Sequence, residues 1–342
     1  MSRREPTLED VAREAGVSRA TVSRVVNGVR NVDPALQEVV QRAIDRTGYT
    51  PNRAARSLVT RRAEAVALIL SGAGDAFAAR VFSDPFFGRI VEGGIGFLRA
   101  RAIHPVLLLA ESETAREQVV AYLRQGSADG ALVVSIQADD PLPGMLAAAR
   151  IPAVYFARPA PATHSSPAGW VDLDHAEGAR LAATHLLERG RRRIVTISGP
   201  RSLPAARERL DGFRTALAAA GITRVPAAEG NFTAESGARA MGRLVAETPD
   251  LDGVFAANDL MAQGACQYLR EHGRAVPGDV SVVGFDDSSV ATACRPALTT
   301  VRQPVERMAA AMAELLIDQL QGSRTEPGSR VFAPELVVRE SS

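Results

Sequence analysis

Short apolar runs recur along most of the chain, and amphipathic stretches separate them. The apolar runs cover residues 65–70, 105–110, 130–135, 153–157, 193–198, 253–259 and 280–287. Continuous apolar runs of this length are typical of strands that are buried on both faces of a sheet. The amphipathic stretches at 87–100, 176–189 and 207–220 predict helices between the strands. Strands that alternate with helices predict parallel sheets with right-handed crossovers, and therefore an α/β body.

Two segments of this body resemble each other. "ADGALVVS" at 128–135 and "LDGVFAAN" at 251–258 both pass from an Asp-Gly step into an apolar strand. This repeat predicts two similar α/β lobes, and the cleft between two lobes is a natural ligand site. The glycine-rich "GGIG" at 93–96 falls within a helical pattern, where we expect it to permit close helix packing.

The first 50 residues follow a helical pattern instead. Apolar positions at helical spacing predict one helix after Thr7, a second after Ser18 and a third from near Pro34. Thr7 and Asp10 fit a capping arrangement, and Gly16 fits the positive φ of a helix end. The inward positions are Leu8, Val11, Ala12 and Ala15, then Val22, Val25 and Val26, then Leu36, Val39, Val40, Ala43 and Ile44. Two short helices joined through a glycine turn, with a third that closes the core, predict a helix-turn-helix.

The outward face of the second helix indicates a nucleic-acid contact. It consists of hydrogen-bonding side chains with no acid among them, namely Ser18, Arg19, Thr21, Ser23, Arg24 and Asn27. Hydroxyl and amide groups reach phosphates, while an arginine fork fits O6 and N7 of guanine. The alternative is a small helical bundle with no role at nucleic acid.

The charge distribution favours the DNA-binding interpretation. Residues 1–62 hold 12 Arg against 7 acidic residues, a balance of +5, whereas the remainder holds 28 against 32, a balance of −4. A basic head on a mildly acidic body indicates that the head meets a polyanion.

The bulk composition excludes several protein classes. The chain has 342 residues, of which 46% are hydrophobic, as in an ordinary globular protein. No apolar run approaches the roughly 20 residues that cross a bilayer, and the charged N-terminus lacks the apolar core of a secretory signal. We therefore expect a cytoplasmic protein without a membrane partner, in which Cys266 and Cys294 stay reduced.

No catalytic or metal-binding set is evident in the sequence. It has no Walker-type glycine loop, no G-x-S-x-G, no H-E-x-x-H and no clustered Cys and His ligands. The five histidines are scattered, and the paired acids of "DDP" and "FDDS" lack a nucleophile or a metal partner. We therefore expect no enzyme activity, no cofactor and no metal.

The head resembles that of a known family. "TLEDVAREAGVSRATVSRVVNG", followed by "GYTPNRAARSL", resembles the DNA-binding head of the LacI/GalR family of bacterial transcription regulators. In the body, "FSDPFF", "GPRSLPAARERLDGF", "FAANDLM", "VVGFDDS" and "LTTVRQP" are similar to segments of that family's periplasmic-binding-protein-like core. The resemblance implies an all-α helix-turn-helix head with a hinge helix, joined to a two-lobed α/β core.

The resemblance also implies domain boundaries. The DNA-binding domain would span residues 1–50, the hinge helix 51–62, and the effector-binding and dimerisation core 63–342. The chain would cross between the lobes near 158–162, 288–292 and 322–327. The first lobe would then comprise about 63–159 and 291–323, and the second about 160–290 and 324–342.

The family's DNA contacts carry over position by position. Arg19 and Ala20 occupy the recognition positions that vary with the operator, and Arg24 would contact a base edge. Phosphates would be held by Thr7, Ser18, Thr21, Ser23 and Asn27. In the hinge, Asn52 and Arg53 would lie near the DNA backbone and the small Ala55 would let two hinge helices approach. Leu58 would then wedge between base pairs in the minor groove.

The effector contacts carry over in the same way. Arg209 would clamp sugar hydroxyls, Asn258 and Asp286 would accept hydrogen bonds from them, and Phe232 would stack on a pyranose. Arg158, Asp174 and Phe86 would reach the same cleft. Local roles are the alternative: a cap on the following helix for Asp174, and a core position for Phe86.

These features together favour a dimeric repressor of carbohydrate-utilisation genes that binds a pseudo-palindromic operator and leaves it when a small sugar binds. "FSDPFF", "YFARP", "VDLDH" and "EGNFT" look most like actinobacterial members that respond to oligosaccharides such as cellobiose. A purine effector, or none, is the alternative within the family. A sugar-binding transport receptor is the competing class, but it would need a signal sequence and no DNA-binding head. Whether the regulator represses or activates depends on where its operator lies.

Overall fold

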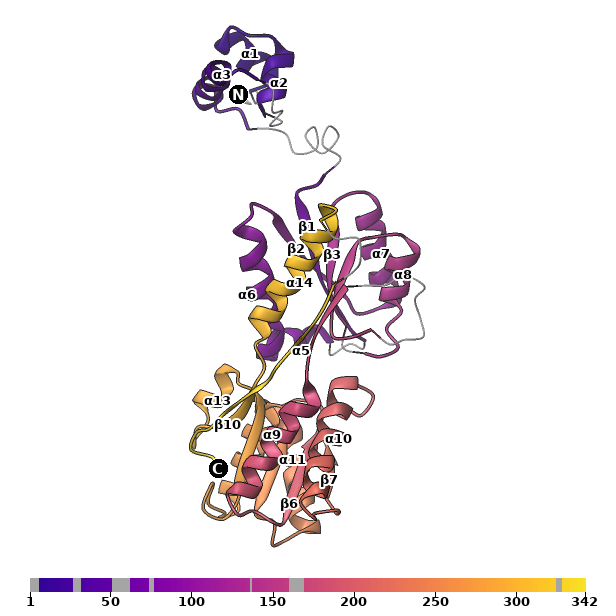
Figure 1. Ribbon diagram of the computed structural model, residues 1–342, viewed down its shortest axis with the longest axis vertical. Coiled ribbons are helices and arrows are strands. Elements are labelled where there is room, and N and C mark those ends of the chain that lie inside the picture. Colours follow the sequence, from indigo (N-terminus) through magenta and orange to yellow (C-terminus); the bar gives the residue numbers. More distant parts are fainter. Residues whose placement is uncertain are drawn as a thin grey trace. The chain divides into compact units, whose positions relative to one another are not determined.

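The computed structural model describes residues 6–26, 32–50, 62–73, 77–135, 137–159, 169–323 and 328–342 (Figure 1). The chain forms two compact units. One contains Met1–Ala65 with the turn Gly126–Asp129, and the other contains Val66–Gln125 and Gly130–Ser342.

The N-terminal unit contains the three helices that the sequence predicts. They are α1 (Leu8–Ala15), α2 (Arg19–Val26) and α3 (Pro34–Thr47). Val11, Ala12, Val22, Val40 and Ala43 form their buried core. This confirms the predicted helix-turn-helix.

Local capping sets the ends of the first two helices. The Asp10 carboxylate accepts hydrogen bonds from the Thr7 backbone N–H at 2.9 Å and from the Thr7 hydroxyl at 2.7 Å. Gly16 ends α1 at a φ of 67°, a conformation that glycine adopts without steric cost. The Ser18 hydroxyl then accepts from the Thr21 N–H at 3.1 Å and caps α2.

The larger unit contains two six-stranded sheets. The first has the order β11-β5-β4-β3-β1-β2. Its strands are β1 (Ala65–Ser71), β2 (His104–Ala110), β3 (Gly130–Ser135), β4 (Ala153–Phe156), β5 (Gly169–Leu173) and β11 (Ser329–Phe332). The accompanying helices are α5 (Phe77–Ser83), α6 (Pro85–Arg99), α7 (Glu113–Arg124), α8 (Leu142–Ala148) and α14 (Val305–Leu320). Every residue of β1 is buried, as expected for a strand that helices cover on both faces.

The second sheet has the order β12-β10-β9-β8-β6-β7. Its strands are β6 (Ile194–Ser198), β7 (Ala227–Glu229), β8 (Gly253–Ala256), β9 (Ser281–Asp286), β10 (Thr299–Arg302) and β12 (Glu335–Val337). Its helices are α9 (His175–Glu188), α10 (Pro204–Ala219), α11 (Ala234–Glu247), α12 (Asp259–Glu271) and the short α13 (Ser289–Ala293). β12 runs antiparallel to β10, whereas β10, β9, β8, β6 and β7 pair in parallel. The two sheets confirm the two α/β lobes.

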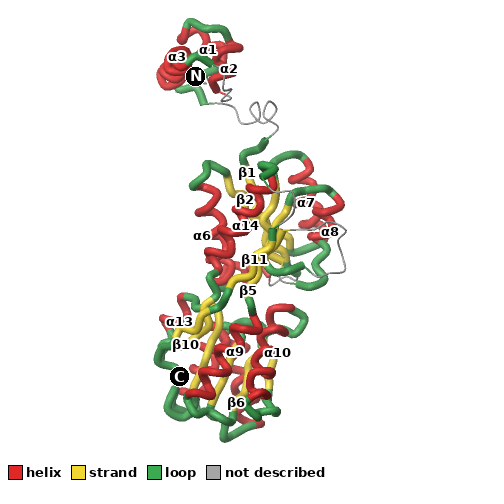
Figure 2. The backbone as a smooth tube through the Cα atoms, viewed as in Figure 1, coloured by secondary structure: helices red, strands yellow, loops and turns green. Residues whose placement is uncertain are grey.

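Sheet membership places the three crossings between the lobes later than the sequence suggested (Figure 2). β5 still pairs with β4 in the first sheet, and β10 pairs with β9 in the second. The chain therefore crosses after Leu173, after Arg302 and between β11 and β12, not near 158–162, 288–292 and 322–327. By this criterion the first lobe holds the described residues of 66–173 and 305–332, apart from the turn at 126–129, and the second holds 174–304 and 333–342. The boundaries implied by the resemblance had placed β5 and β11 in the second lobe and β10 in the first, whereas strand pairing places each in the other sheet.

Close helix packing explains the first glycine of "GGIG", Gly93, whereas a Cβ at Gly96 would meet nothing within 4 Å. α6 and α14 lie side by side in the first lobe (Figure 1). A Cβ added at Gly93 would lie 2.3 Å from the backbone oxygen of Glu306, so only glycine fits at this contact.

Cys266 and Cys294 are both buried and unbridged. Within the described part of the chain, no helix has the length and apolarity needed to span a bilayer.

Candidate functional site

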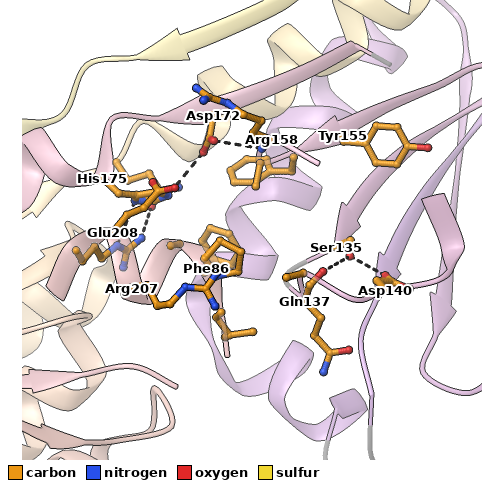
Figure 3. A pocket seen from close by; sticks show the side chains of 18 of the residues that line it. Phe86, Ser135, Gln137, Asp140, Tyr155, Arg158, Asp172, His175, Arg207 and Glu208 are labelled. Atoms are coloured by element: carbon orange, nitrogen blue, oxygen red, sulfur yellow. Dashed lines mark hydrogen bonds and ion pairs between the residues drawn. The ribbon is translucent and has the colours of Figure 1, made fainter. Parts of the chain in front are cut away.

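A cavity of about 320 Å³ lies between the two lobes of the larger unit (Figure 3). Six of the seven predicted effector residues line it: Phe86, Arg158, Arg209, Phe232, Asn258 and Asp286. They come from both lobes and lie far apart in the sequence. The cavity is therefore the candidate ligand site.

Arg209 of α10 is buried at this site and is held on several sides. Its Nη1 donates to the Ala257 carbonyl at 2.6 Å, and its Nη2 donates to Oε1 of Gln303 at 3.2 Å. The guanidinium lies over the Phe285 ring, 3.7 Å from the centroid. These contacts fix the side chain in one orientation before a ligand arrives.

His175 supports the same arginine. Nε of Arg209 donates to Nδ1 of His175 at 3.2 Å, so that nitrogen serves as an acceptor. Burial, and then the charge of Arg209, lower the pKa of His175 well below its usual value. A neutral imidazole is consistent with this hydrogen bond, because a protonated ring has no acceptor nitrogen.

Asp286 ends β9 beside Arg209, with Oδ1 3.6 Å from Nη1 of the arginine. Burial raises the pKa of Asp286 to about 8, Asp259 and Asp84 add to the rise, and Arg209 opposes it. Its φ is 108°, a backbone conformation that is costly for any residue with a side chain. Strain of this kind is maintained by the surrounding structure and is often found at binding sites.

Arg89 of α6, in the first lobe, hydrogen-bonds to the backbone at Asp286 and Gln303. Its Nη1 donates to the Asp286 carbonyl at 2.8 Å and its Nη2 donates to the Gln303 carbonyl at 3.0 Å. Glu306 accepts from the same guanidinium at 2.5 and 2.9 Å. One arginine thus connects the first lobe to the loop that positions Asp286.

Asn258 and Phe232 form another part of the second lobe's surface. The Asn258 side chain caps α12 by accepting from the Met261 N–H at 2.9 Å, and its Nδ2 donates to the Phe232 carbonyl at 3.1 Å. Phe232 has a φ of 68°, and its ring packs where a Cβ at Gly199 would otherwise lie. Asn258 therefore positions Phe232 in addition to lining the cavity itself.

The first lobe supplies aromatic and charged side chains. Phe86 lines the cavity and also packs edge-to-face on Phe87 and Phe156, so it is both a lining and a core residue. The Arg158 guanidinium lies 4.7 Å from the centroid of the Trp170 ring.

Asp174 is the exception among the predicted effector residues. It does not line the cavity, and its carboxylate accepts from the Glu177 N–H at 2.9 Å, which caps α9. This is the local role that the sequence left open. Asp172, two residues earlier, lines the cavity instead and accepts from the Arg158 N–H at 3.2 Å. Burial raises the pKa of Asp172.

Sequence reasoning missed several other lining residues. Among the polar ones are Arg80, Asp84, Ser135, Gln137, Asp140, Tyr155, Asp172, His175, Arg207, Glu208 and Gln303. In the first lobe, the Ser135 hydroxyl donates to Asp140 at 2.6 Å (Figure 3). Nε of Arg116 donates to the same carboxylate at 3.2 Å. Several of these residues lie in sequence segments that the resemblance had already singled out, namely "FSDPFF", "YFARP", "VDLDH", "GPRSLPAARERLDGF" and "LTTVRQP". Arg80, Ser135 and Gln137 lie outside those segments.

The predicted DNA-contacting residues of the head gather on and around α2. Ser18, Arg19, Ala20 and Arg24 are exposed, whereas Thr7, Thr21 and Ser23 are half-buried. Nε of Arg19 lies 3.1 Å from the carboxylate of Glu9 on α1, a partner that the sequence did not predict. Asn27 and the predicted hinge residues Asn52, Arg53, Ala55 and Leu58 lie outside the described residues.

The described residues contain no group of three or more His, Cys, Asp or Glu side chains arranged to hold a metal ion. The geometry of the cavity is instead that of a polar and aromatic site for an organic ligand.

Comparison with known proteins supports both parts of the structure. Residues 7–52 match the model of the bacterial regulatory proteins of the lacI family, and residues 183–342 match a periplasmic binding protein-like domain. The HTH-type transcriptional regulator CelR of Thermobifida fusca is 47% identical over 99% of both chains. The HTH-type transcriptional repressor PurR of Erwinia tasmaniensis is 34% identical over 98% of this chain and 96% of its own.

Solved structures agree with these matches. A transcriptional regulator CelR–cellobiose complex is 44% identical with a TM-score of 0.76, and covers 99% of this chain and 100% of its own. A Lac repressor dimer bound to operator and the anti-inducer ONPF is 28% identical with a TM-score of 0.84, over 99% of both chains. The chain therefore belongs to the LacI family of bacterial regulatory proteins and is a DNA-binding transcriptional regulator.

Proposed function

We propose that this regulator is a cytoplasmic homodimer that represses carbohydrate-utilisation genes and leaves its operator when a short gluco-oligosaccharide such as cellobiose binds. The observation that carries this proposal is the cavity between the lobes, where buried polar groups meet aromatic rings. Planar polar side chains suit sugar hydroxyls, and aromatic faces suit the apolar C–H faces of a pyranose.

The charge of the lining supports an uncharged ligand. Four arginines line the cavity, namely Arg80, Arg158, Arg207 and Arg209. Five acidic residues face them, namely Asp84, Asp140, Asp172, Glu208 and Asp286. Near balance of the two signs disfavours a phosphorylated or strongly anionic effector and favours a neutral, hydroxyl-rich one. The 47% identity to CelR, against 34% to PurR, supports a sugar over a purine.

The head supplies the DNA contacts in this proposal. Arg19 reads a base edge together with Arg24, Ala20 offers its methyl group, and Thr7, Ser18, Thr21, Ser23 and Asn27 hold phosphates. Asn52, Arg53, Ala55 and Leu58 act from the hinge. Two heads of a dimer would occupy the two halves of a pseudo-palindromic operator.

The sugar acts by binding one arrangement of the lobes more tightly than another. A ligand with equal affinity for both arrangements shifts no population, however tightly it binds. A ligand that contacts residues of both lobes meets this condition, because its contacts depend on how the lobes are arranged.

The decisive experiment combines DNA binding with an effector panel. The operator is first obtained by selecting tight binders from a random duplex library, and operator affinity is then measured with cellobiose, longer cello-oligosaccharides, hypoxanthine and guanine. We expect cellobiose or a longer homologue to lower operator affinity at least about tenfold, or roughly 1.4 kcal/mol. Purines should have no effect.

Two results would contradict the proposal in different ways. A purine that binds and changes operator affinity, while the sugars do not bind, would overturn the effector class. A sugar that binds by calorimetry but leaves operator affinity unchanged would overturn the allosteric mechanism.

A further inference from the structure

Arg80 of α5 approaches the candidate effector site from the opposite lobe to Arg209, Asn258 and Asp286. It lines the same cavity, and its guanidinium carbon lies 5.1 Å from the centroid of the Phe232 ring. α5 belongs to the first lobe, whereas Phe232 belongs to the second. The contact therefore spans the site where we expect the effector.

The hydrogen bonding of Arg80 is incomplete. Its Nε is buried and has no hydrogen-bond partner among the described residues. Asp84 lies four residues further on, but its carboxylate accepts from the Phe86 N–H at 3.0 Å and caps α6. Burial lowers the pKa of Arg80, and the charge of Asp84 only partly opposes this.

A buried donor without an acceptor is costly and rare, and such a group calls for an explanation. Arg209, on the other side of the cavity, has a protein partner for each of its three nitrogens. Arg80 thus differs from Arg209 in that it lines the cavity but carries a buried donor for which no described residue supplies an acceptor. An oxygen-rich ligand would supply the missing acceptor.

We propose that Arg80 is an effector-binding residue whose Nε–H donates to an oxygen of the bound sugar. This inference rests on the proposed sugar-responsive function. It assigns to the first lobe a direct, charge-assisted contact with the ligand, opposite the contacts from Arg209, Asn258 and Asp286 in the second lobe.

Binding then exchanges one partner of Arg80 for another. A sugar that stacks on the Phe232 ring takes the place of the guanidinium, which turns to the sugar oxygens. A partly exposed cation–π contact is worth about two- to fivefold in affinity. A hydrogen bond to a charged group is worth about 10- to 150-fold. The exchange therefore favours the bound state, and it ties ligand affinity to the positions of both lobes.

The test compares three single substitutions in the full-length protein. Arg80→Met keeps an unbranched stem of similar length and removes every donor. Arg80→Lys keeps the charge and removes the planar Nε donor. The matched control is Arg101→Met, because Arg101 is also a first-lobe arginine stacked on a phenylalanine, Phe97, but lies outside the cavity lining.

Cellobiose and cellotriose affinities are measured by calorimetry, and operator affinity without sugar shows that each variant is folded and dimeric. We expect Arg80→Met to weaken sugar binding about tenfold or more, while sugar-free operator affinity stays within about twofold of wild type. Arg80→Lys should remain several-fold weaker than wild type, and Arg101→Met should bind sugar normally.

Unchanged or tighter sugar binding by Arg80→Met would overturn the inference, and so would full recovery by Arg80→Lys. An equal loss in Arg101→Met would assign the effect to lobe stability and would also overturn it. If wild type binds none of the sugars, the proposed function itself fails, which is a separate result from a wild type that binds and an Arg80→Met variant that binds equally well.

Discussion

Arg19 on α2 pairs with Glu9 on α1, with 3.1 Å between Nε and the carboxylate oxygen. Both side chains are more than half exposed, at 68% and 55%. An exposed ion pair of this kind contributes little to stability, about 0–1 kcal/mol. Its consequence concerns recognition, because it occupies one edge of the guanidinium that we expect to read the operator.

Replacing Arg19 with Ala should relax specificity at one base position of each half-site. A good arginine–guanine contact contributes about 1–3 kcal/mol of discrimination. Binding-site selection with the variant should therefore show one position that no longer prefers guanine, while the other positions keep their preference. An unchanged selected sequence would contradict the assignment of Arg19.

Glu9→Gln should raise affinity for unrelated DNA by a few-fold, because it removes a negative charge beside α2 and frees Arg19 for phosphates. The ratio of specific to non-specific affinity should then fall. The measurement is a salt titration of binding to operator and to unrelated duplexes. Glu14→Gln is the control, since Glu14 pairs with Arg46 of α3 at 3.4 Å. Identical effects of the two substitutions would show that net charge alone is responsible.

Substitutions of Asp172 and Asp174 should have different effects, one on sugar affinity and the other on stability. Asp174→Ala removes the cap of α9 and should cost about 0.5–2 kcal/mol of stability without changing sugar affinity. Asp172→Asn should weaken sugar binding, because its carboxylate lines the cavity beside Arg158. Urea unfolding and calorimetry on both variants test the pair. A loss of sugar affinity in Asp174→Ala would contradict the local role that its hydrogen bond indicates.

Asp286→Asn should alter the pH dependence of stability. Burial raises the pKa of Asp286 to about 8, against 3.8 for the unperturbed group. Between these values the folded protein holds a proton that the unfolded chain releases, so this group makes stability fall as pH rises from about 4 to 8. The asparagine variant should therefore gain stability relative to wild type as pH rises towards 8, measured as a difference in Tm.

Asp259 also contributes to the fall in stability with rising pH, and it does so in the variant as well as in wild type. Burial raises its pKa to about 6, and it accepts hydrogen bonds from Ser288 and Thr300. The contribution of Asp259 cancels when variant and wild type are compared, so the difference in Tm should grow from about pH 4 and be largest near pH 8. Parallel Tm curves for the two proteins across pH 4 to 8 would show that folding does not raise the pKa of Asp286.

The sequence by itself determined the head and the class of the body. The caps at Thr7 and Ser18, the turn at Gly16 and the spacing of valines are local features, so they specify helices without knowledge of distant contacts. The long apolar runs likewise indicated buried parallel strands. Family resemblance then placed Arg209, Phe232, Asn258 and Asp286, all of which line the cavity.

Tertiary structure decided the rest, because the cavity forms where elements distant in sequence converge. Asp172 and Asp174 look alike in the sequence, but β5 ends at Leu173, so Asp174 leaves the strand and caps a helix. The crossings between lobes depended on the pairing of short strands, which no local pattern reveals. Burial, which only the folded chain creates, raises the pKa of Asp286 and leaves Nε of Arg80 without an acceptor among the described residues.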